Sequence, residues 1–193
     1  MRYRRITAAI LDVLIFLIFI IVLFALVMPL NKNAIQLSNE FNSYLVNIEN
    51  IVKMTEAEKN QIIETAYLLD RETSYFYIVV ALVIIIYFVF IPRWLNGKTV
   101  GQYVRKVKLV SENEEKVTLN QYIIRALLNS GLFLIILMPL FIYICNAIWY
   151  SNVTSFLCMV QLIYWFISLV MLIIKKKTIH DYITKTKIIE VKR

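Results

Sequence analysis

The sequence has few of the residues on which catalytic and metal sites depend. Its 193 residues include one histidine, two cysteines and three glycines. His180 belongs to no HExxH motif and no Ser-His-Asp order, and the chain has neither a glycine-rich phosphate loop nor a CxxC pair. Cys145 and Cys158 lie in or beside apolar segments without a nearby histidine, which fits neither a metal site nor a redox pair. We therefore expect a protein that is not an enzyme and that carries no metal and no cofactor.

Charged residues are also scarce. They make up 18% of the chain, whereas hydrophobic residues make up 60% and the mean hydropathy is +0.69. In a typical soluble domain about a quarter of the residues are charged, so this composition indicates an integral membrane protein whose main partner is the lipid bilayer. The formal net charge of +8 would suggest nucleic-acid binding if the basic residues formed one soluble face, but they flank apolar runs. We therefore expect no nucleic-acid partner.

Four apolar runs are long enough to cross a bilayer of roughly 30 Å as helices. The predicted spans cover approximately residues 6–30, 75–91, 126–146 and 156–174. Pro139 lies inside the third span and is expected to kink it, because proline lacks the N–H of a helical hydrogen bond. The sequence therefore predicts an all-α membrane protein with four transmembrane helices.

Charges are distributed unequally between the segments outside these spans. Residues 93–120 hold six basic and three acidic residues, whereas residues 31–74 hold four basic and seven acidic ones. Basic residues accumulate on the cytoplasmic side of membrane proteins. We therefore expect a multi-pass protein of the cell membrane with both termini in the cytoplasm and with residues 31–74 outside it.

Residues 31–74 are predicted to form a helical extracytoplasmic insertion. Apolar residues recur there at helical spacing in two stretches that join near Met54. Thr55 and Glu58 form a capping-box sequence at the start of the second stretch. The two amphipathic helices can pack on each other or on the lipid interface, or they can capture a ligand, and the sequence leaves these alternatives open.

Residues 93–120 and 175–193 are predicted to form cytoplasmic elements. Apolar and polar residues alternate over Val104–Val110 and again over Lys116–Leu119, which is the pattern of a β-hairpin. Residues 184–191 have the same character and would supply a third strand. The exposed face of this sheet would be basic, so anionic lipid headgroups are an expected partner.

One carboxylate, that of Asp12, lies inside the first predicted span. An unpaired aspartate at the centre of a membrane helix costs about 2.5 to 3.5 kcal/mol on insertion scales, so its side chain should face protein or trapped water. As a functional group it would bind a proton or Na⁺. As a structural group it would pair with Arg5, seven residues earlier on the same helix face, or with Arg125, which can equally anchor its helix at the interface. The residues leave both roles open.

His180 and Asp181 form a second candidate site near the C-terminus. They could act as a proton relay, but adjacent residues on a helix point in different directions, so the pair could instead cap a helix or anchor the cytoplasmic sheet. Arg5, Arg125, Asp12 and this pair all fall on the predicted cytoplasmic side. We therefore expect one charged cluster in the inner half of the membrane.

The positions of these charged residues resemble those of a known family. Arg5 and Asp12 match an arginine at the start of a first helix and an aspartate within it, and the sequence HDYI at 180–183 looks like a closing His-Asp-Leu-Leu stretch. In this order they resemble the RDD family of bacterial membrane proteins, which is named for one arginine and two aspartates. The resemblance implies that Asp181 is the second aspartate.

A third motif lies between these two. Residues 97–110, with Gly97, Thr99 and Gly101, look like the cytoplasmic Gly-x-Thr-x-Gly segment of the family. The resemblance covers nearly the whole chain and implies a single RDD-like membrane domain over residues 1–193, with residues 31–74 as an insertion relative to shorter members. One departure is Lys185, where the family often has glycine, and this puts a tight turn there in doubt.

Two functions are compatible with these features. The resemblance implies a transporter, and sodium/proton exchange is attributed to some family members. Asp12 would then carry the exchangeable charge, Asp181 and His180 would be further ion or proton ligands, and the protein would need to form a homo-oligomer because four short helices leave little room for alternating access. The alternative is a non-catalytic interaction or assembly protein. In that case the Arg/Asp set is structural and the chain presents its insertion or its sheet to a protein partner.

Overall fold

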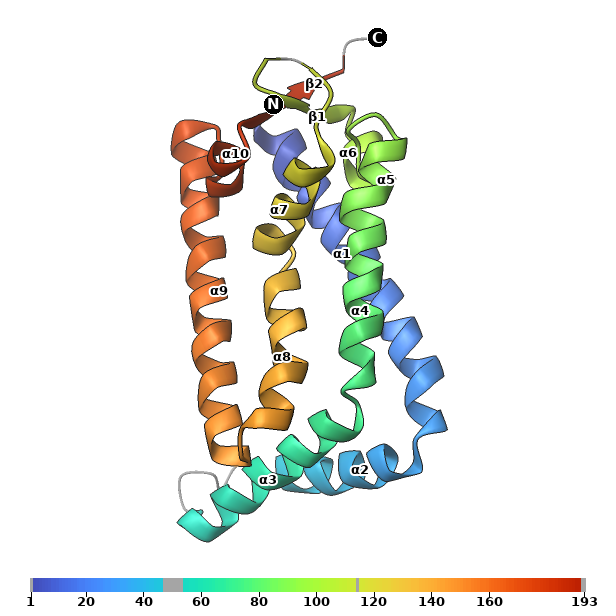
Figure 1. Cartoon of the computed structure of the whole chain (residues 1–193), viewed down its shortest axis with the longest axis vertical. Coiled ribbons are helices and arrows are strands. Elements are labelled where there is room, and N and C mark those ends of the chain that lie inside the picture. Colours follow the sequence, from blue (N-terminus) through green and yellow to red (C-terminus); the bar gives the residue numbers. More distant parts are fainter. Residues whose placement is uncertain (1, 47–53, 114, 192–193) are drawn as a thin grey trace. The chain divides into compact units, whose positions relative to one another are not determined.

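The computed structural model describes residues 2–46, 54–113 and 115–191 of the chain. Most of these residues are helical, and two short strands form one sheet (Figure 1). By the clustering of its contacts the chain divides into two compact units. Unit 1 comprises Met1–Ile20, Val80–Phe133 and Val160–Arg193, and unit 2 comprises Ile21–Val79 and Leu134–Met159.

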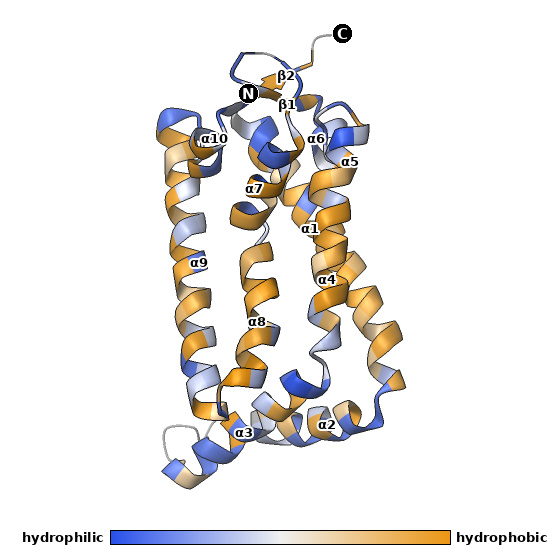
Figure 2. Ribbon diagram, in the orientation of Figure 1, coloured by the Kyte–Doolittle hydropathy of each residue, from blue (hydrophilic) through white to orange (hydrophobic). Residues whose placement is uncertain are grey.

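Among the described residues, three helical segments are long and apolar enough to cross a membrane, and a pair of broken helices would supply a fourth span. The three segments are Tyr3–Leu30, Tyr75–Trp94 and Ala147–Lys175, and the pair is Leu119–Asn129 with Leu132–Ile144. Apolar residues run along all of them, as the colouring of α4 and α8 shows (Figure 2). The predicted helical architecture is therefore confirmed, with three to four candidate membrane spans where the sequence predicted four.

The second span contains a π-helical segment. It consists of α4 (Tyr75–Ile85), the π-helix η3 (Ile86–Phe90) and the short α5 (Ile91–Trp94), and the Ile91 N–H donates to the Ile86 carbonyl oxygen. Pro92 follows immediately and has no N–H to donate. In an ordinary α-helix its ring would clash with the carbonyl group four residues earlier, and a wider π turn relieves such a clash. The helix therefore continues through Pro92 to Trp94.

The third span is broken rather than continuous. Its first part, α7 (Leu119–Asn129), is followed by the C-cap residue Ser130, and α8 (Leu132–Ile144) begins after Gly131. Gly131 has a φ of +71°, the left-handed conformation that commonly terminates a helix. Pro139, where the sequence predicted a kink, lies inside α8. The helix break therefore falls at glycine and not at proline.

Unit 1 contains a two-stranded antiparallel sheet, and the predicted hairpin is wrong. β1 (Val107–Ser111) pairs with β2 (Thr186–Glu190), so the C-terminal strand is the partner of β1. The segment expected to form the second strand of the hairpin lies before α7 and at its start. There Thr118 caps α7 by a capping box with Gln121. The Thr-x-x-Gln sequence therefore specifies a helix start and overrides the short alternating pattern.

Unit 2 contains the insertion as two helices, α2 (Lys32–Val46) and α3 (Glu56–Glu72), which pack on each other. The predicted capping box of Thr55 and Glu58 is confirmed, since the Thr55 N–H donates to the Glu58 carboxylate at 2.7 Å. Asn31 links the two helices, because its side chain donates to the Glu72 carbonyl oxygen and accepts from the Ala34 N–H. Most of the connection between the helices, residues 47–53, lies outside the described residues.

The insertion is also bound to the ends of α8 and α9 (Ala147–Lys175) within unit 2. The Tyr67 hydroxyl donates to the Ile142 carbonyl oxygen at 2.9 Å, and the Tyr150 hydroxyl donates to the Asp70 carboxylate at 3.0 Å. Tyr67 also packs against a buried cluster formed by Met138, Ile142 and Tyr150. The apolar side of α3 is therefore occupied by other parts of the same unit.

Candidate functional site

The Asp12 carboxylate is buried in unit 1 and accepts three hydrogen bonds. Its Oδ1 accepts from the Tyr87 hydroxyl at 2.7 Å and from the Gly101 N–H at 2.8 Å, and its Oδ2 accepts from the Thr99 hydroxyl at 2.6 Å. Only 5% of the residue is exposed. In the described part of the chain no arginine or lysine pairs with this carboxylate, so its hydrogen-bond partners are all uncharged.

Two of these donors come from the start of α6 (Val100–Val104). Thr99 is the N-cap residue and forms a capping box with Gln102, whose N–H donates to the Thr99 hydroxyl oxygen. Because that oxygen already accepts a hydrogen bond, the hydroxyl hydrogen is free to point at Asp12. Asp12 also lies at the N-terminal turn of α6, where backbone N–H groups favour a carboxylate.

Glycine is required at position 101 by close packing. A Cβ atom there would overlap the Ala8 carbonyl oxygen and would lie 2.9 Å from the carboxyl carbon of Asp12. Gly97 is required by close packing and by its conformation, since a Cβ atom there would overlap the Leu109 carbonyl oxygen and its φ is +87°. Its carbonyl oxygen accepts from the Leu109 N–H at 2.7 Å. The two glycines of the Gly-x-Thr-x-Gly segment therefore let α1 (Arg2–Val27) approach α6 and let the chain turn back onto β1.

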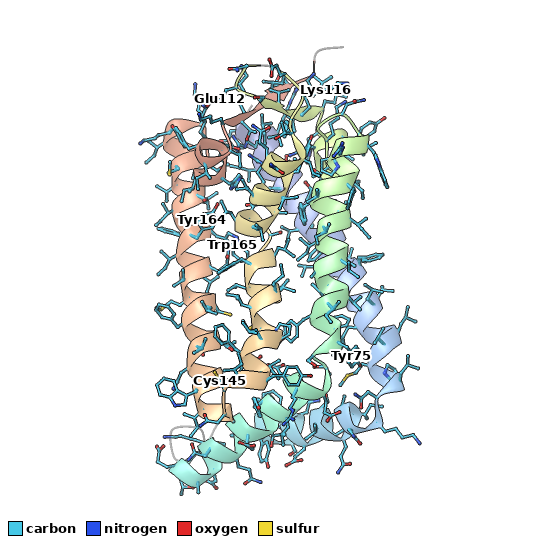
Figure 3. All side chains as sticks on the ribbon, in the orientation of Figure 1. Tyr75, Glu112, Lys116, Cys145, Tyr164 and Trp165 are labelled. Carbon is cyan, nitrogen blue, oxygen red and sulfur yellow. The ribbon has the colours of Figure 1, made fainter. Side chains whose placement is uncertain are left out.

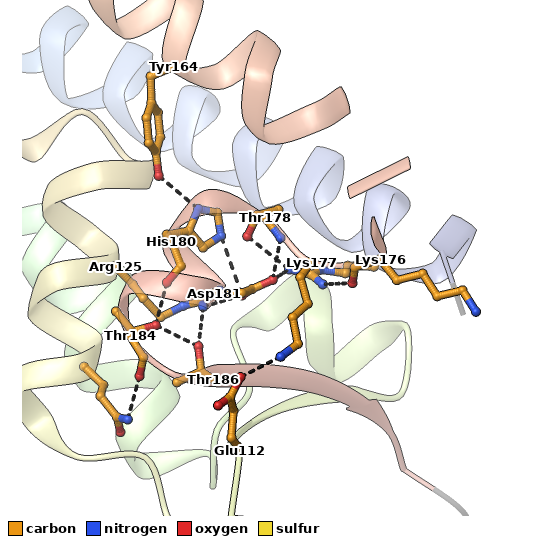
Figure 4. A network of polar contacts seen from close by, with 12 residues as sticks. Glu112, Arg125, Tyr164, Lys176, Lys177, Thr178, His180, Asp181, Thr184 and Thr186 are labelled. Atoms are coloured by element: carbon orange, nitrogen blue, oxygen red, sulfur yellow. Dashed lines mark hydrogen bonds and ion pairs between the residues drawn. The ribbon is translucent and has the colours of Figure 1, made fainter. Parts of the chain in front are cut away.

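Asp181 is the centre of a second, charged network in unit 1, on the five-residue helix α10 (Ile179–Ile183) (Figure 4). The residue is fully buried. Arg5 binds its Oδ2, Arg125 binds its Oδ1 at 2.5 Å, and the Thr178 N–H donates to Oδ2 at 3.0 Å. Asp181 thus joins α1 and α7 to α10 through two guanidinium groups.

Hydroxyl and carbonyl groups accept further hydrogen bonds from the two arginines. Arg125 also donates to the Thr186 hydroxyl oxygen at 2.7 Å, and Arg5 also donates to the Lys176 carbonyl oxygen at 3.1 Å. The Thr184 hydroxyl donates to the His180 carbonyl oxygen, so the 2.8 Å contact between the two threonine hydroxyls is donated by Thr186. Buried arginine pairs are stable only when their hydrogen bonds are satisfied in this way.

His180 lies beside the network and is held in its neutral form. Burial lowers the pKa of its imidazole to about 3, and the positive charge of Arg125 acts in the same direction. Its Nδ1 contacts the Tyr164 hydroxyl of α9 at 3.3 Å, and its Nε2 is 3.9 Å from Asp181. Burial alone would raise the pKa of the Asp181 carboxyl, but Arg125 and Arg5 outweigh it and hold that pKa below the usual range. Asp181 is therefore an ionised, fixed acceptor.

The structure separates residues that the sequence placed in one cluster. The sequence offers Arg5 and Arg125 as partners of Asp12, but both bind Asp181. Side chains of an α-helix lean toward its N-terminus, so Arg5 extends away from Asp12, which lies seven residues later. Thr99 and Gly101 are brought to Asp12 and His180 to Asp181, whereas Gly97 contacts Leu109 of β1.

Sequence reasoning missed Tyr87, Thr178 and Thr186. Tyr87 lies in an apolar run and is set against Asp12 by the π-helical segment, so no local pattern identifies it. Thr178 had a signal, since Thr178-x-x-Asp181 repeats the N-cap sequence that was recognised at Thr55. Other polar contacts in unit 1 join helix to helix. Trp165 lies on α9, where Figure 3 labels it, and its indole N–H donates to the Asn129 carbonyl oxygen at 2.9 Å.

Comparison with known proteins gives one match. The model of the RDD family matches residues 2–185. No curated protein and no solved structure matches the chain. Within the described residues, no group of three or more histidine, cysteine, aspartate or glutamate side chains is placed to hold a metal ion.

Proposed function

The chain belongs to the RDD family of membrane proteins, and from this premise we propose that it is a transporter that exchanges protons for a monovalent cation such as Na⁺ at Asp12. The observation that carries the proposal is the contrast between its two buried aspartates. Asp181 is neutralised by two guanidinium groups, whereas the donors that Asp12 has among the described residues are all uncharged. Asp12 is thus the carboxylate whose charge is left for a proton or a cation to balance.

The surroundings of Asp12 suit a small cation. The hydroxyl oxygens of Tyr87 and Thr99 lie 2.7 and 2.6 Å from the carboxylate oxygens, and hydroxyl and carboxylate oxygens are ligands of hard cations. An ionisable residue inside a membrane helix is a functional candidate because its charge is costly there. A carboxylate in a medium of low dielectric constant is stabilised by binding either a proton or a metal cation, and this alternation is the basis of exchange.

The proposal includes an orientation and an assembly. We place both termini in the cytoplasm of a cell-membrane protein and the α2–α3 insertion outside, because residues 93–120 are net basic and residues 31–74 are net acidic. In this orientation the Asp181 network lies at the inner surface. The small number of spans leaves little room for alternating access in one copy, so we propose a homo-oligomer as the transporting form. No enzymatic step is part of the proposal.

A second candidate function is favoured by the burial and charge pairing of the Asp181 network. That network joins α1, α7 and α10 through one buried carboxylate and two guanidinium groups, as expected for a rigid scaffold. Asp12 would then serve only to dock α6 on α1, and the chain would act as an assembly protein that presents its insertion to a partner. This candidate predicts that a change of Asp12 lowers the yield of folded protein and that the wild type itself shows no ion flux.

The test is ²²Na⁺ uptake into proteoliposomes driven by an outward proton gradient. Asp12→Asn is nearly isosteric, and its amide oxygen can accept from Tyr87 and Gly101 while its NH₂ group faces the Thr99 hydroxyl oxygen. We expect this variant to fold and to lose uptake. Asp70→Asn, which changes a carboxylate outside the spans, is the matched control and should keep uptake. Wild-type flux retained in folded Asp12→Asn protein would refute the exchange function, and absence of wild-type flux together with unfolding of the variant would favour the scaffold.

A further inference from the structure

Two segments of unit 1 repeat one another in sequence. Residues 98–111 read KTVGQYVRKVKLVS, and residues 177–190 read KTIHDYITKTKIIE. The two copies share the initial Lys-Thr, the central tyrosine and both later lysines at the same positions. Valine, leucine or isoleucine stands in both copies at most of the apolar positions.

The copies also have the same structure. In each copy a threonine N–H donates to the side chain three residues later, from Thr99 to Gln102 at 3.1 Å and from Thr178 to Asp181 at 3.0 Å. A five-residue helix follows, α6 in the first copy and α10 in the second, and then a five-residue strand. The residue two positions before each helix is a lysine, Lys98 or Lys177.

The turn between helix and strand is the most specific shared feature. It places a lysine in the left-handed conformation in both copies, Lys106 with a φ of 56° and Lys185 with a φ of 49°. Left-handed backbone is unfavourable for a residue with a long side chain, so its recurrence at the same position indicates one shared design. It also shows that the tight turn is formed at Lys185 without glycine.

The register of the sheet relates the two copies by an approximate twofold axis. Leu109 pairs with Ile188 at the centre, and the outer pairs, Val107 with Glu190 and Ser111 with Thr186, lie symmetrically on either side. Each copy follows two candidate spans along the chain. Because both copies end in the same sheet, each pair of spans with its following copy has the same orientation as the other, so these are parallel and not inverted membrane repeats.

The outward-facing residues show what the repeated motif presents. Tyr103 and Tyr182 are 62% and 46% exposed, and each ring lies under a lysine ammonium of its own copy, Lys98 at 5.5 Å and Lys177 at 5.4 Å. An aliphatic residue follows each tyrosine and is also exposed. An exposed tyrosine beside an aliphatic side chain and lysines is the combination found at membrane interfaces.

The differences between the copies are chiefly at inward-facing positions. Gly101, which donates to Asp12, corresponds to His180, and the buried Val107 corresponds to Thr186, which binds Arg125. The inner sides have thus become two different polar sites, whereas the outer sides kept tyrosine and lysine. A feature that both copies keep while their interiors diverge has a role of its own at the surface.

We infer that residues 98–111 and 177–190 are two copies of one membrane-surface anchor that binds anionic phospholipid. Each copy inserts its tyrosine and the following aliphatic side chain between headgroups, and its exposed lysines contact the headgroup phosphates. Lys106 and Lys185 are exposed in the turns of the two copies and are the equivalent basic contacts. Lipid is the occupant because both short helices begin only a few residues after membrane spans that end at Trp94 and Lys175. This inference does not depend on ion exchange at Asp12.

The test compares the melting temperature of the full-length protein in detergent with added phosphatidylglycerol and with added phosphatidylcholine. Lys106→Asn and Lys185→Asn remove a charge and keep the left-handed backbone, which asparagine tolerates. The melting temperature of the wild type should rise more with phosphatidylglycerol than with phosphatidylcholine. Each single variant should lose about half of this difference, and the double variant most of it. Lys59→Asn, in the insertion, is the matched control and should keep the full difference.

Several outcomes would overturn the inference. They are a full phosphatidylglycerol effect in the double variant, an effect carried wholly by one copy, and an equal effect of inorganic phosphate. Melting temperatures in phosphatidylcholine show whether each variant is folded. If the asparagine variants are unfolded there, Tyr103→Ser and Tyr182→Ser give the same comparison without changing the turns, and they should each reduce the gain.

Discussion

Arg5 and Asp12 lie seven residues apart on α1 and bind the two copies of the repeated motif in opposite ways. Asp12 accepts hydrogen bonds from Thr99 and Gly101 of the first copy, and Arg5 donates to Asp181 of the second. One helix is thus fixed to the sheet region at two points, through an anion at one and a cation at the other. α1 packs closely on α6 at Gly101, and there the short side chain of Asp12 makes the contact. In the second copy His180 stands at the position of this glycine, and the longer side chain of Arg5 reaches α10.

Replacing Arg5 with glutamine is expected to destabilise the protein strongly. Asp181 is fully buried, and removal of one partner of a buried ion pair costs about 3–5 kcal/mol because the remaining charge is less well compensated. The adjacent Arg4 is the matched control, because its ion pair with Glu190 is solvent-exposed and such pairs contribute at most about 1 kcal/mol. Thermal unfolding in detergent should separate Arg5→Gln from Arg4→Gln clearly. Equal losses in the two variants would show that the Asp181 network is not a stabilising element.

Substitution of Gly101 by alanine should disrupt the docking of α6 on α1. The added methyl group would overlap the backbone oxygen of Ala8, which no side-chain rotation can move away. Such overpacking typically costs about 1–3 kcal/mol. Gly131→Asn is the control, since a Cβ atom at Gly131 meets open space and asparagine tolerates its positive φ. A melting temperature of Gly101→Ala as high as that of Gly131→Asn would contradict the close approach.

Much of this arrangement could be predicted from local sequence, and the remainder depends on contacts between distant residues. The membrane class, the Thr55 cap and the C-terminal strand follow from composition and short patterns. The partners of Asp12 do not, because Tyr87 and Thr99 lie 75 and 87 residues away in the chain. A count of charges makes arginine the obvious partner of Asp12, but the two arginines are already bound by Asp181. Side-chain direction on α1, rather than charge, decides between the two aspartates.

Stability should fall as the pH is lowered below about 6.5, the ordinary pKa of histidine, because of His180. Burial lowers the pKa of its imidazole to about 3 in the folded protein, whereas unfolding restores the ordinary value. Between these two values the unfolded state binds one more proton, so the free energy of unfolding decreases by up to about 1.4 kcal/mol per pH unit. His180→Gln removes the titrating group and should flatten this dependence between pH 6 and pH 5. Melting temperatures at the two pH values measure the slope, and an unchanged slope in His180→Gln would assign it to another group.

The Asp181 carboxyl contributes to the pH dependence of stability at lower pH than His180 does. Arg125 and Arg5 hold its pKa below the ordinary value, so its contribution to stability is complete above about pH 4 and is lost as the pH falls further. Asp181→Asn should therefore remove the steep loss of stability below pH 4 and leave the slope between pH 6 and pH 5, which belongs to His180, in place. The variant is also expected to be less stable at neutral pH, because two buried guanidinium groups lose their carboxylate. Chemical denaturation across this pH range separates the two contributions.

The hydrogen bond between Tyr87 and Asp12 is best measured by a double-mutant cycle. Tyr87→Phe keeps the ring on the π-helical segment and removes the hydroxyl group that donates to Oδ1 at 2.7 Å. A hydrogen bond to a charged group contributes about 1.5–3 kcal/mol, and one between neutral groups about 0.5–1.5 kcal/mol. Tyr87→Phe should therefore cost more in the wild type, where the acceptor is a carboxylate, than in Asp12→Asn protein. Tyr103→Phe, which removes an exposed hydroxyl, should change the free energy of unfolding by no more than about 0.5 kcal/mol. Equal costs of Tyr87→Phe in both backgrounds would show that the Tyr87 hydroxyl makes no hydrogen bond that depends on the Asp12 carboxylate.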